Sequence, residues 1–127
     1  MQIKVLQQEK ILLSAFDSDK IDINLENEAL HFGAISMFVA ALGRCTFAVL
    51  NSYAIRLDLD TDTITITLDW DYLNEPTRIN QINMQIYWPE LPDKRLKSVQ
   101  RATHMCTIHN TIHECVSIHT EVTNDQK

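Results

Sequence analysis

Residues 35–56 read ISMFVAALGRCTFAVLNSYAIR, and this stretch decides the fold. Apolar side chains occupy nearly every position, so a helix built from it has no continuous polar side. A helix that is apolar almost all round is a buried one. We therefore predict a central buried helix here, beginning near Gly33 or Ser36. The strongly polar positions inside it are few: Ser36, Arg44, Asn51 and Ser52, before Arg56.

Alternating apolar and polar residues on both sides of this helix predict β-strands. Residues 1–26 contain three short alternating runs, with a turn-forming Asp-Ser-Asp segment at 17–19. After the helix, residues 63–72 and 79–88 alternate in the same way and are joined by turn residues at 74–77. This second pair of runs is predicted to form a hairpin with one half-exposed face.

A second helix and a last strand are predicted toward the C-terminus. Asp93 can cap a helix that continues or restarts through His113, and residues 116–122 then alternate as a strand. Strands before, between and after two helices, without a regular strand–helix–strand rhythm, indicate an α+β domain rather than a doubly wound one. We expect a single domain over residues 1–127, with two long central helices packed against antiparallel β-sheets.

The composition narrows the classes of function. A chain of 127 residues with 45% hydrophobic and 22% charged residues is ordinary for a globular domain. The net charge is −6 and the eleven lysines and arginines are scattered, so we expect no nucleic-acid partner. The opening MQIKVLQQEK lacks the apolar core of a signal peptide, and no apolar run reaches the roughly 18 residues of a membrane span. We therefore expect a cytoplasmic protein with no membrane partner.

Cysteine usage points to thiol chemistry. Three cysteines cannot all pair within one molecule, and a cytosolic thiol is more often reduced, catalytic or metal-bound than structural. Residues 40–45 read AALGRC, and residues 106–112 read CTIHNTI, followed by the predicted strand VSIHTEV at 116–122. The two motifs lie about sixty residues apart, with the predicted hairpin and the start of a helix between them.

These two motifs resemble A-A-L-G-S-C and C-P-[VI]-H-x-[TA]-[LI] of the OsmC/Ohr family of thiol-dependent peroxide reductases, and the resemblance extends over about residues 33–123. It implies an OsmC-like fold in an intertwined homodimer, with both thiols between the long helices near the dimer interface. Cys45 would attack an organic hydroperoxide or hydrogen peroxide, and Cys106 would resolve the sulfenic acid as a disulfide. A cellular dithiol would recycle the disulfide in oxidative-stress defence, without a cofactor.

Two further observations bear on this expectation. The central helix is too apolar for a chain of this size to cover alone, which also favours a homodimer. The family's S-P-x-E segment, whose glutamate orients an arginine that lowers the thiol pKa, corresponds to Gly-Ala-Ile-Ser at 33–36, and the N-terminal region offers lysines at 4, 10 and 20 but no arginine. Arg44 adjoins Cys45 but points about 100° away on a helix. The alternative is a non-catalytic protein that binds a small molecule on the same scaffold.

The remaining candidates have simpler explanations. His109 and His113 are four residues apart, so both imidazoles would share one helix face, and with His104, Cys106 and Cys115 nearby a transition-metal site is chemically conceivable. This spacing is not a recognised zinc signature, and we predict no metal ligands. Cys115 is expected to be a packing residue. Asp58, Asp60 and Asp62 are expected to lie in a solvated turn, and Trp70 and Trp88 in the core or a dimer contact.

Overall fold

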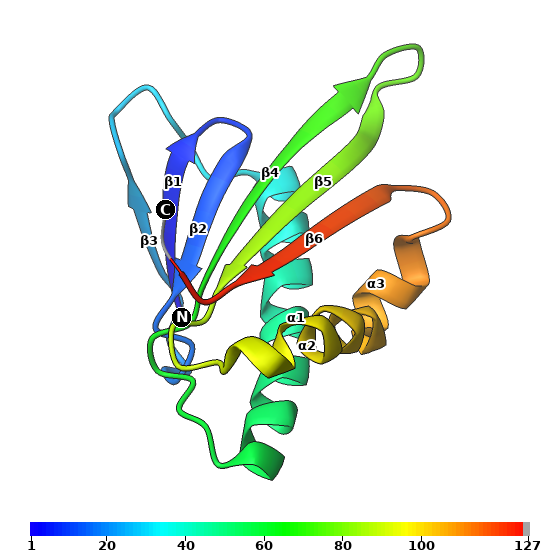
Figure 1. Ribbon diagram of the computed structural model, residues 1–127. Helices are drawn as coiled ribbons and strands as arrows, with labels where there is room; N and C mark the ends of the chain where they lie inside the picture. Colours follow the sequence, from blue (N-terminus) through cyan, green and yellow to red (C-terminus); the bar gives the residue numbers. More distant parts are fainter. Residues whose placement is uncertain (126–127) are drawn as a thin grey trace.

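The computed structural model describes residues 1–125, which form one six-stranded sheet with helices on one of its faces (Figure 1). Turns of 3₁₀ helix at Asp93–Arg95 and Thr103–Met105 flank the second helix. The α+β class predicted from the sequence is confirmed. The elements in chain order are β1 (Gln2–Gln7), β2 (Lys10–Ser14), β3 (Asp22–Leu25), α1 (Ala34–Leu57), β4 (Thr65–Leu73), β5 (Arg78–Tyr87), α2 (Leu96–Ala102), α3 (Thr107–Ile112) and β6 (Ser117–Thr123).

The strands are ordered β3-β1-β2-β4-β5-β6, and the sheet is mixed. The β1·β2, β2·β4 and β4·β5 pairs are antiparallel, whereas β1·β3 and β5·β6 are parallel. The expectation of purely antiparallel sheets was therefore wrong. The chain leaves β5, passes through α2 and α3, and returns to the same end of the sheet, which is the kind of crossover that a parallel pair requires.

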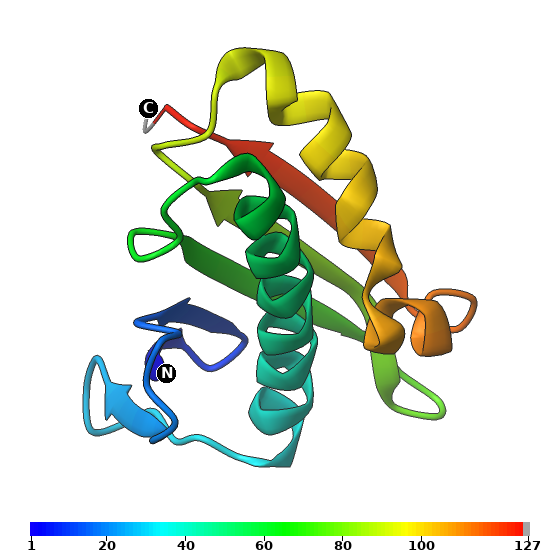
Figure 2. The same cartoon turned by 90° about the horizontal axis from the view of Figure 1, so that it is seen from below.

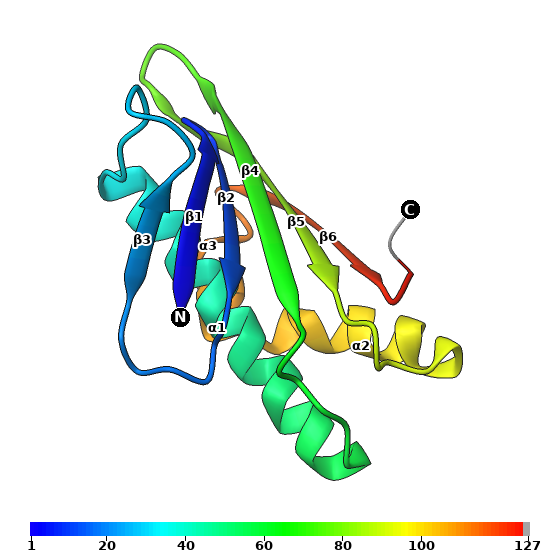
Figure 3. The same ribbon diagram turned by 90° about the vertical axis from the view of Figure 1, so that its left-hand side faces the viewer.

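All three helices lie over the same face of the sheet, where α1 runs beside the α2–α3 pair (Figure 2). In the view of Figure 3 the strands lie in front of α1, and no helix of the described residues covers the outer face. The inward-facing residues of the strands and α1 make the core. Trp70 and Trp88 are both buried in it, as the alternation predicted. Fully buried members include Ile11, Leu13, Leu42, Leu50, Ile66, Leu68, Ile82, Met84 and Ile86.

Gly43 allows α1 to approach the sheet closely. A Cβ atom at this position would lie 2.5 Å from Cδ1 of Leu13 on β2 and 3.0 Å from Cδ1 of Leu68 on β4. Both leucines are fully buried, so they have little room to move aside. A glycine is therefore needed where the helix crosses the boundary between β2 and β4, despite its low helix propensity.

Only one of the two expected long helices is present in the described chain. α1 has 24 residues, but the segment after Asp93 is divided into α2, with seven residues, and α3, with six. The break falls at Cys106, whose backbone is extended at φ −65° and ψ 129°. No proline or glycine marks this position in the sequence, so the hydrophobic periodicity left open whether the helix continues or restarts there.

By length and composition alone, α1 would be apolar enough to cross a membrane. In the fold it is the core helix, and 44% of its most apolar window is buried. Its other side carries exposed apolar residues, among them Met37 (58% exposed) and Ile55 (74% exposed). The prediction of a helix buried all round was thus only half right, because the sheet covers one side of α1 and leaves the other open.

Candidate active site

Cys45 lies on α1, two residues after Gly43, and is half-buried. It packs against the edge of the core, so its thiol has apolar neighbours and partial contact with solvent. The preceding residue, Arg44, is exposed, and its guanidinium carbon lies 5.6 Å from the centre of the Phe47 ring. The prediction that Arg44 points away from Cys45 is consistent with this position, since the cation rests on an aromatic ring.

Cys106 is the N-cap residue of α3 and is fully buried, with 0% of its surface exposed. Its Sγ accepts a hydrogen bond from the backbone N–H of His109, at 3.4 Å. The motif's proline is replaced by Thr107, yet the cysteine still occupies the start of a helix. A thiol can therefore take the place of the hydroxyl or carboxylate that more commonly caps a helix.

The pKa of Cys106 is raised above its ordinary value, chiefly because burial disfavours the charged thiolate. The neighbouring Cys45 thiol raises it further, through a side-chain interaction and through charge. Backbone hydrogen bonds from His109 and Ile108 oppose these effects and lower the pKa. The cysteines of the two motifs, Cys45 and Cys106, are thus brought together between α1 and α3. Both are free thiols.

Three histidine rings form a stack beside Cys106. The ring centres of His104 and His109 are 4.8 Å apart, and those of His109 and His113 are 5.4 Å apart, with the rings nearly parallel. His109 is buried at 8% exposure, and its Nδ1 has no hydrogen-bond partner among residues 1–125. Burial lowers the pKa of His109, and the charge of His104 lowers it further.

The histidine stack does not form a metal centre. Within the described residues, no group of three or more histidine, cysteine, aspartate or glutamate side chains is arranged to hold a metal ion. In a tetrahedral site the ligand lone pairs converge on one metal ion. The nitrogen lone pairs of stacked, parallel rings do not converge on a common point. The stack was missed in the sequence because its first member, His104, lies on a separate 3₁₀ turn from the helical pair.

The OsmC-like protein family model matches residues 26–121, which contain both cysteine motifs and both helical regions. The chain belongs to the OsmC-like protein family. The match covers most of the chain, including all three helices and the β4–β5 hairpin, so the family assignment made from the two motifs is confirmed. No curated protein matches the sequence.

Three solved structures share the OsmC-like fold. A candidate osmotic stress induced and detoxification response protein from Psychrobacter arcticus 273-4 is 13% identical, with a TM-score of 0.68 over 95% of this chain and 93% of that one. A candidate redox protein from Lactobacillus casei ATCC 334 is 12% identical, with a TM-score of 0.65 over 80% and 73%. A hypothetical protein from Aquifex aeolicus VF5 is 12% identical, with a TM-score of 0.61 over 74% and 76%. At these identities the likeness shows the fold alone.

The third cysteine lies apart from this pair. Cys115 is exposed in the turn between α3 and β6, so the expectation that it packs into the core was wrong. Its backbone N–H donates to the carbonyl of Ile112, which fixes the turn without burying the thiol. Cys115 is therefore a useful matched control for the other two cysteines.

Lys4, one of the cations of the N-terminal region, is paired with a carboxylate. Lys4 Nζ forms an ion pair with Glu26 Oε2 at 3.1 Å, and both side chains are about half exposed. The lysine thus has a partner on β3's C-terminal side, outside the core that holds Cys106. Exposed pairs of this kind contribute little to stability, typically about 0–1 kcal/mol.

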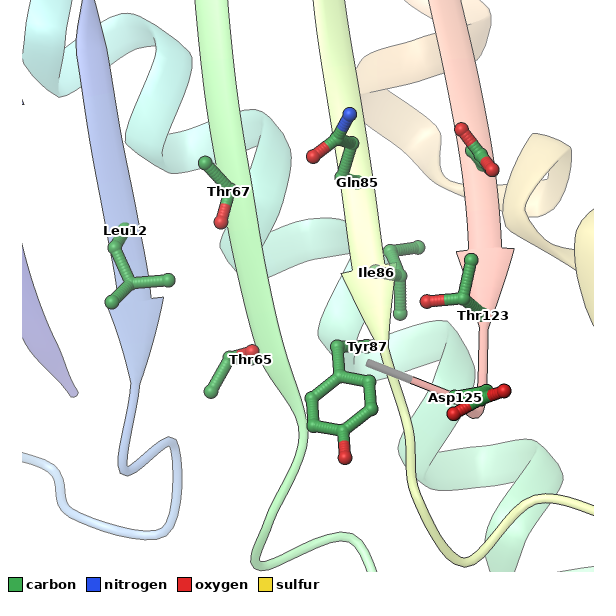
Figure 4. A pocket seen from close by; sticks show the side chains of 9 residues that line it. Leu12, Thr65, Thr67, Gln85, Ile86, Tyr87, Thr123 and Asp125 are labelled. Carbon is green, nitrogen blue, oxygen red and sulfur yellow. The ribbon is translucent and has the colours of Figure 1, made fainter. Parts of the chain in front are cut away.

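A concavity of about 650 Å³ is on the outer face of the sheet (Figure 4). Neither Cys45 nor Cys106 lines it. Figure 4 shows its polar side chains arrayed along β4, β5 and β6, which alternate with the core residues of the same strands. Thiol chemistry in this fold therefore belongs to the helical face. The lining residues are Leu12, Thr65, Thr67, Gln85, Ile86, Tyr87, Glu121, Thr123 and Asp125.

Proposed function

We propose that this OsmC-like protein reduces organic hydroperoxides or hydrogen peroxide with a dithiol made of Cys45 and Cys106, as part of oxidative-stress defence. The observation that carries the proposal is a pair of neighbouring free thiols, one half-buried and one fully buried. The Cys45 thiol raises the pKa of Cys106. Peroxide in solvent can reach the first more readily than the second. The difference in access supports an attacking role for Cys45 and a resolving role for Cys106.

The chemistry proceeds in two steps on the protein. The Cys45 thiolate attacks the terminal peroxide oxygen, so that an S–O bond forms, the O–O bond breaks, and the alkoxide takes up a proton to leave as an alcohol. Cys106 then attacks the sulfenic sulfur, forming the disulfide while hydroxide leaves and is protonated to water. A cellular dithiol reduces this disulfide by exchange and becomes oxidised itself. A reducing cytoplasm would supply such a dithiol.

The second candidate is a protein that binds a small molecule on the same scaffold without turnover. It is favoured by the position of the nearby cation, since the Arg44 guanidinium rests on the ring of Phe47. No carboxylate occupies residues 33–36, where the motif would place one. Without a cation beside it, a thiol gains no electrostatic help in becoming the reactive thiolate. Slow or absent turnover would follow.

A homodimer is part of the same proposal. The open side of α1 carries Met37, Phe38 and Ile55, all exposed apolar side chains on one long helix. Exposed apolar surface of this kind on a core helix is typical of a subunit interface. A second copy of the chain would bury it and further restrict the access of solvent to the thiols beside α1.

The test is peroxide consumption with dithiothreitol as the reductant and cumene hydroperoxide as the substrate. We expect Cys45→Ser to fall to the uncatalysed background, and Cys106→Ser to accumulate a sulfenic acid on Cys45 that dimedone traps. Cys115→Ser is the matched control and should behave as wild type. After one equivalent of peroxide, mass spectrometry should find a Cys45–Cys106 disulfide. Negligible turnover in every variant, with both thiols still free, would favour the binding protein instead.

A further inference from the structure

The charges of the chain are unevenly distributed, because its cations gather on one segment that has no acids. Residues 94–113 contain no aspartate or glutamate, although the whole chain has seventeen. The same segment holds four of the eleven lysines and arginines, all of them within residues 94–101. A basic region therefore exists in a protein whose net charge is −6. The four cations are Lys94, Arg95, Lys97 and Arg101.

These four cations are not neutralised by the protein. Arg95 is half-buried and the other three are exposed, and none of them forms an ion pair with a carboxylate of the described residues 1–125. The acidic residues of the adjacent strand β6 lie elsewhere, since Glu121 and Asp125 line the concavity on the outer face of the sheet. The basic region thus keeps its full positive charge toward solvent.

The stability of α2 does not explain the position of Lys97. The helix begins at Leu96, so Lys97 lies in its first turn, where the positive end of the helix dipole disfavours a cation. Arg101 suits the last turn of the same helix, but it follows Lys97 by four residues, and like charges at this spacing repel each other. The pair therefore needs a reason outside the helix, and an anionic ligand supplies one.

A concavity of about 370 Å³ lies between these two cations and β6. α2 runs beside β6 on the helical side of the sheet (Figure 2). Val122, which is only 8% exposed, and the half-buried Leu96 give the concavity apolar surface. None of its described lining residues carries a carboxylate. The lining consists of Leu96, Lys97, Gln100, Arg101 and Val122.

Gln100 fixes α2 against the edge of the sheet at this concavity. Its side-chain nitrogen donates to the carbonyl of Thr120, and its Oε1 accepts a hydrogen bond from the backbone N–H of Val122 at 2.9 Å. Since β6 is the last strand of the sheet, the amide occupies the place of a neighbouring strand and covers the free edge. The wall and the apolar surface of the concavity are therefore held together before any ligand binds.

We infer that this concavity binds a small organic phosphate monoester. Two cations one helical turn apart, with no acid nearby, match a dianion better than a monoanion. The planar guanidinium of Arg101 can donate to two phosphate oxygens at once, and Lys97 adds a second charge. The carbon part of the ester would lie on Leu96 and Val122. The volume of about 370 Å³ is in the range of small-molecule sites.

This site is separate from the dithiol. Neither Cys45 nor Cys106 lines the concavity, and none of its lining residues belongs to the cysteine motifs at 40–45 and 106–112. Phosphate-ester binding therefore does not depend on thiol chemistry. Cys45→Ser should bind the ester as tightly as wild type, and a lost affinity in this variant would contradict a separate site.

The experiment is isothermal calorimetry of the full chain with phenyl phosphate, for which we expect saturable binding at one site per chain. Phenyl sulfate has a similar shape but a single negative charge, and inorganic phosphate lacks the apolar part, so each should bind at least about fivefold more weakly. Equal affinity for either of them would overturn the inference. Absent binding of phenyl phosphate would also overturn it, and sedimentation with vesicles that contain phosphatidic acid would then assign the cations to a membrane surface.

Two variants locate the site. Arg101→Gln should weaken the binding of phenyl phosphate at least about tenfold, as expected for lost hydrogen bonds to a charged group. Arg78→Gln, at an exposed cation of the β4–β5 hairpin, should not change it. Lys97→Glu should abolish binding yet keep or raise the melting temperature, because it places an acid in the first turn and four residues before Arg101. Unchanged affinity in Arg101→Gln or Lys97→Glu, or a lower melting temperature in Lys97→Glu, would refute the assignment.

Discussion

The backbone N–H of His109 donates to the sulfur of Cys106, so one residue both orients the buried thiol and partly offsets the cost of its thiolate. Burial and Cys45 act in the other direction and keep the pKa of Cys106 above its ordinary value. At neutral pH the resting site therefore holds Cys106 as a neutral thiol. In the proposed mechanism, this thiol would act as the nucleophile of the second step, on an oxidised Cys45.

The alkylation of Cys106 should consequently need a higher pH than that of a free cysteine, whose pKa is about 8.5. Iodoacetamide labelling as a function of pH, read by mass spectrometry in Cys115→Ser, measures this directly. Cys45→Ala removes the interactions with Cys45 that add to the effect of burial on the pKa of Cys106, and should shift its labelling to lower pH. An unchanged profile in Cys45→Ala would show that the two thiols do not influence each other.

The same pKa shift predicts how stability depends on alkaline pH. The folded pKa of Cys106 is raised, so the unfolded chain loses its proton first as the pH increases. The contribution of Cys106 to stability is complete below about pH 8.5 and is lost as the pH rises through the folded pKa. Urea unfolding measures the free energy of unfolding between pH 7 and 10. Relative to its own value at pH 7, this free energy should decline less in Cys106→Ala than in wild type.

At acidic pH the relevant group is His109. Its folded pKa is lowered, so its contribution to stability is present above the unfolded value of about 6.5 and is lost as the pH falls through the folded value. Replacing His104 by Gln removes a neighbouring positive charge and should raise the pKa of His109 in an NMR titration. His119, which is exposed on β6 and outside the stack, is the internal control.

Gly43→Ala should destabilise the fold by about 1–3 kcal/mol, because the added methyl group collides with two leucines that have no free space. Thermal or urea unfolding measures the loss. Shortening one of those leucines, as in Gly43→Ala with Leu13→Val, should recover part of it. Ala41→Ser, an exposed change on the same helix, should stay within about 0.5 kcal/mol of wild type.

The homodimer is tested at the open side of α1. Phe38→Glu places a charge among exposed apolar side chains and should shift the sedimentation coefficient toward that of a monomer at micromolar concentration. Glu28→Gln, an exposed change before the helix, should leave the association state unaffected. A wild-type chain that sediments as a monomer would contradict the proposal outright.

Local patterns predicted much of this fold. The apolar run at 35–56 located α1 within a residue or two, and strict alternation located the β4–β5 hairpin. These elements are determined by neighbours in sequence, and each pattern has a distinctive period. The two motif cysteines were also found together between α1 and α3, as the family resemblance implied.

Features that depend on distant contacts were not predicted. Whether β6 joins β5 in parallel depends on how far the intervening helices carry the chain, which periodicity does not encode. The helix break at Cys106 coincides with a cysteine side chain that caps α3. No proline or glycine, the usual signals of a helix boundary, marks it in the sequence. Cys115 was misassigned because the general tendency of cysteine toward burial does not apply in a tight exposed turn.

The close crossing at Gly43 ties the redox site to the hydrophobic core. Cys45 follows it by only about 3 Å of helical rise, so any change that lifts α1 from β2 and β4 also moves this thiol relative to Cys106. Mutations deep in the sheet, remote from any peroxide, would thereby alter the reactivity of the dithiol. Under the proposed function, selection for packing and selection for redox chemistry would act on the same few side chains and could not proceed independently.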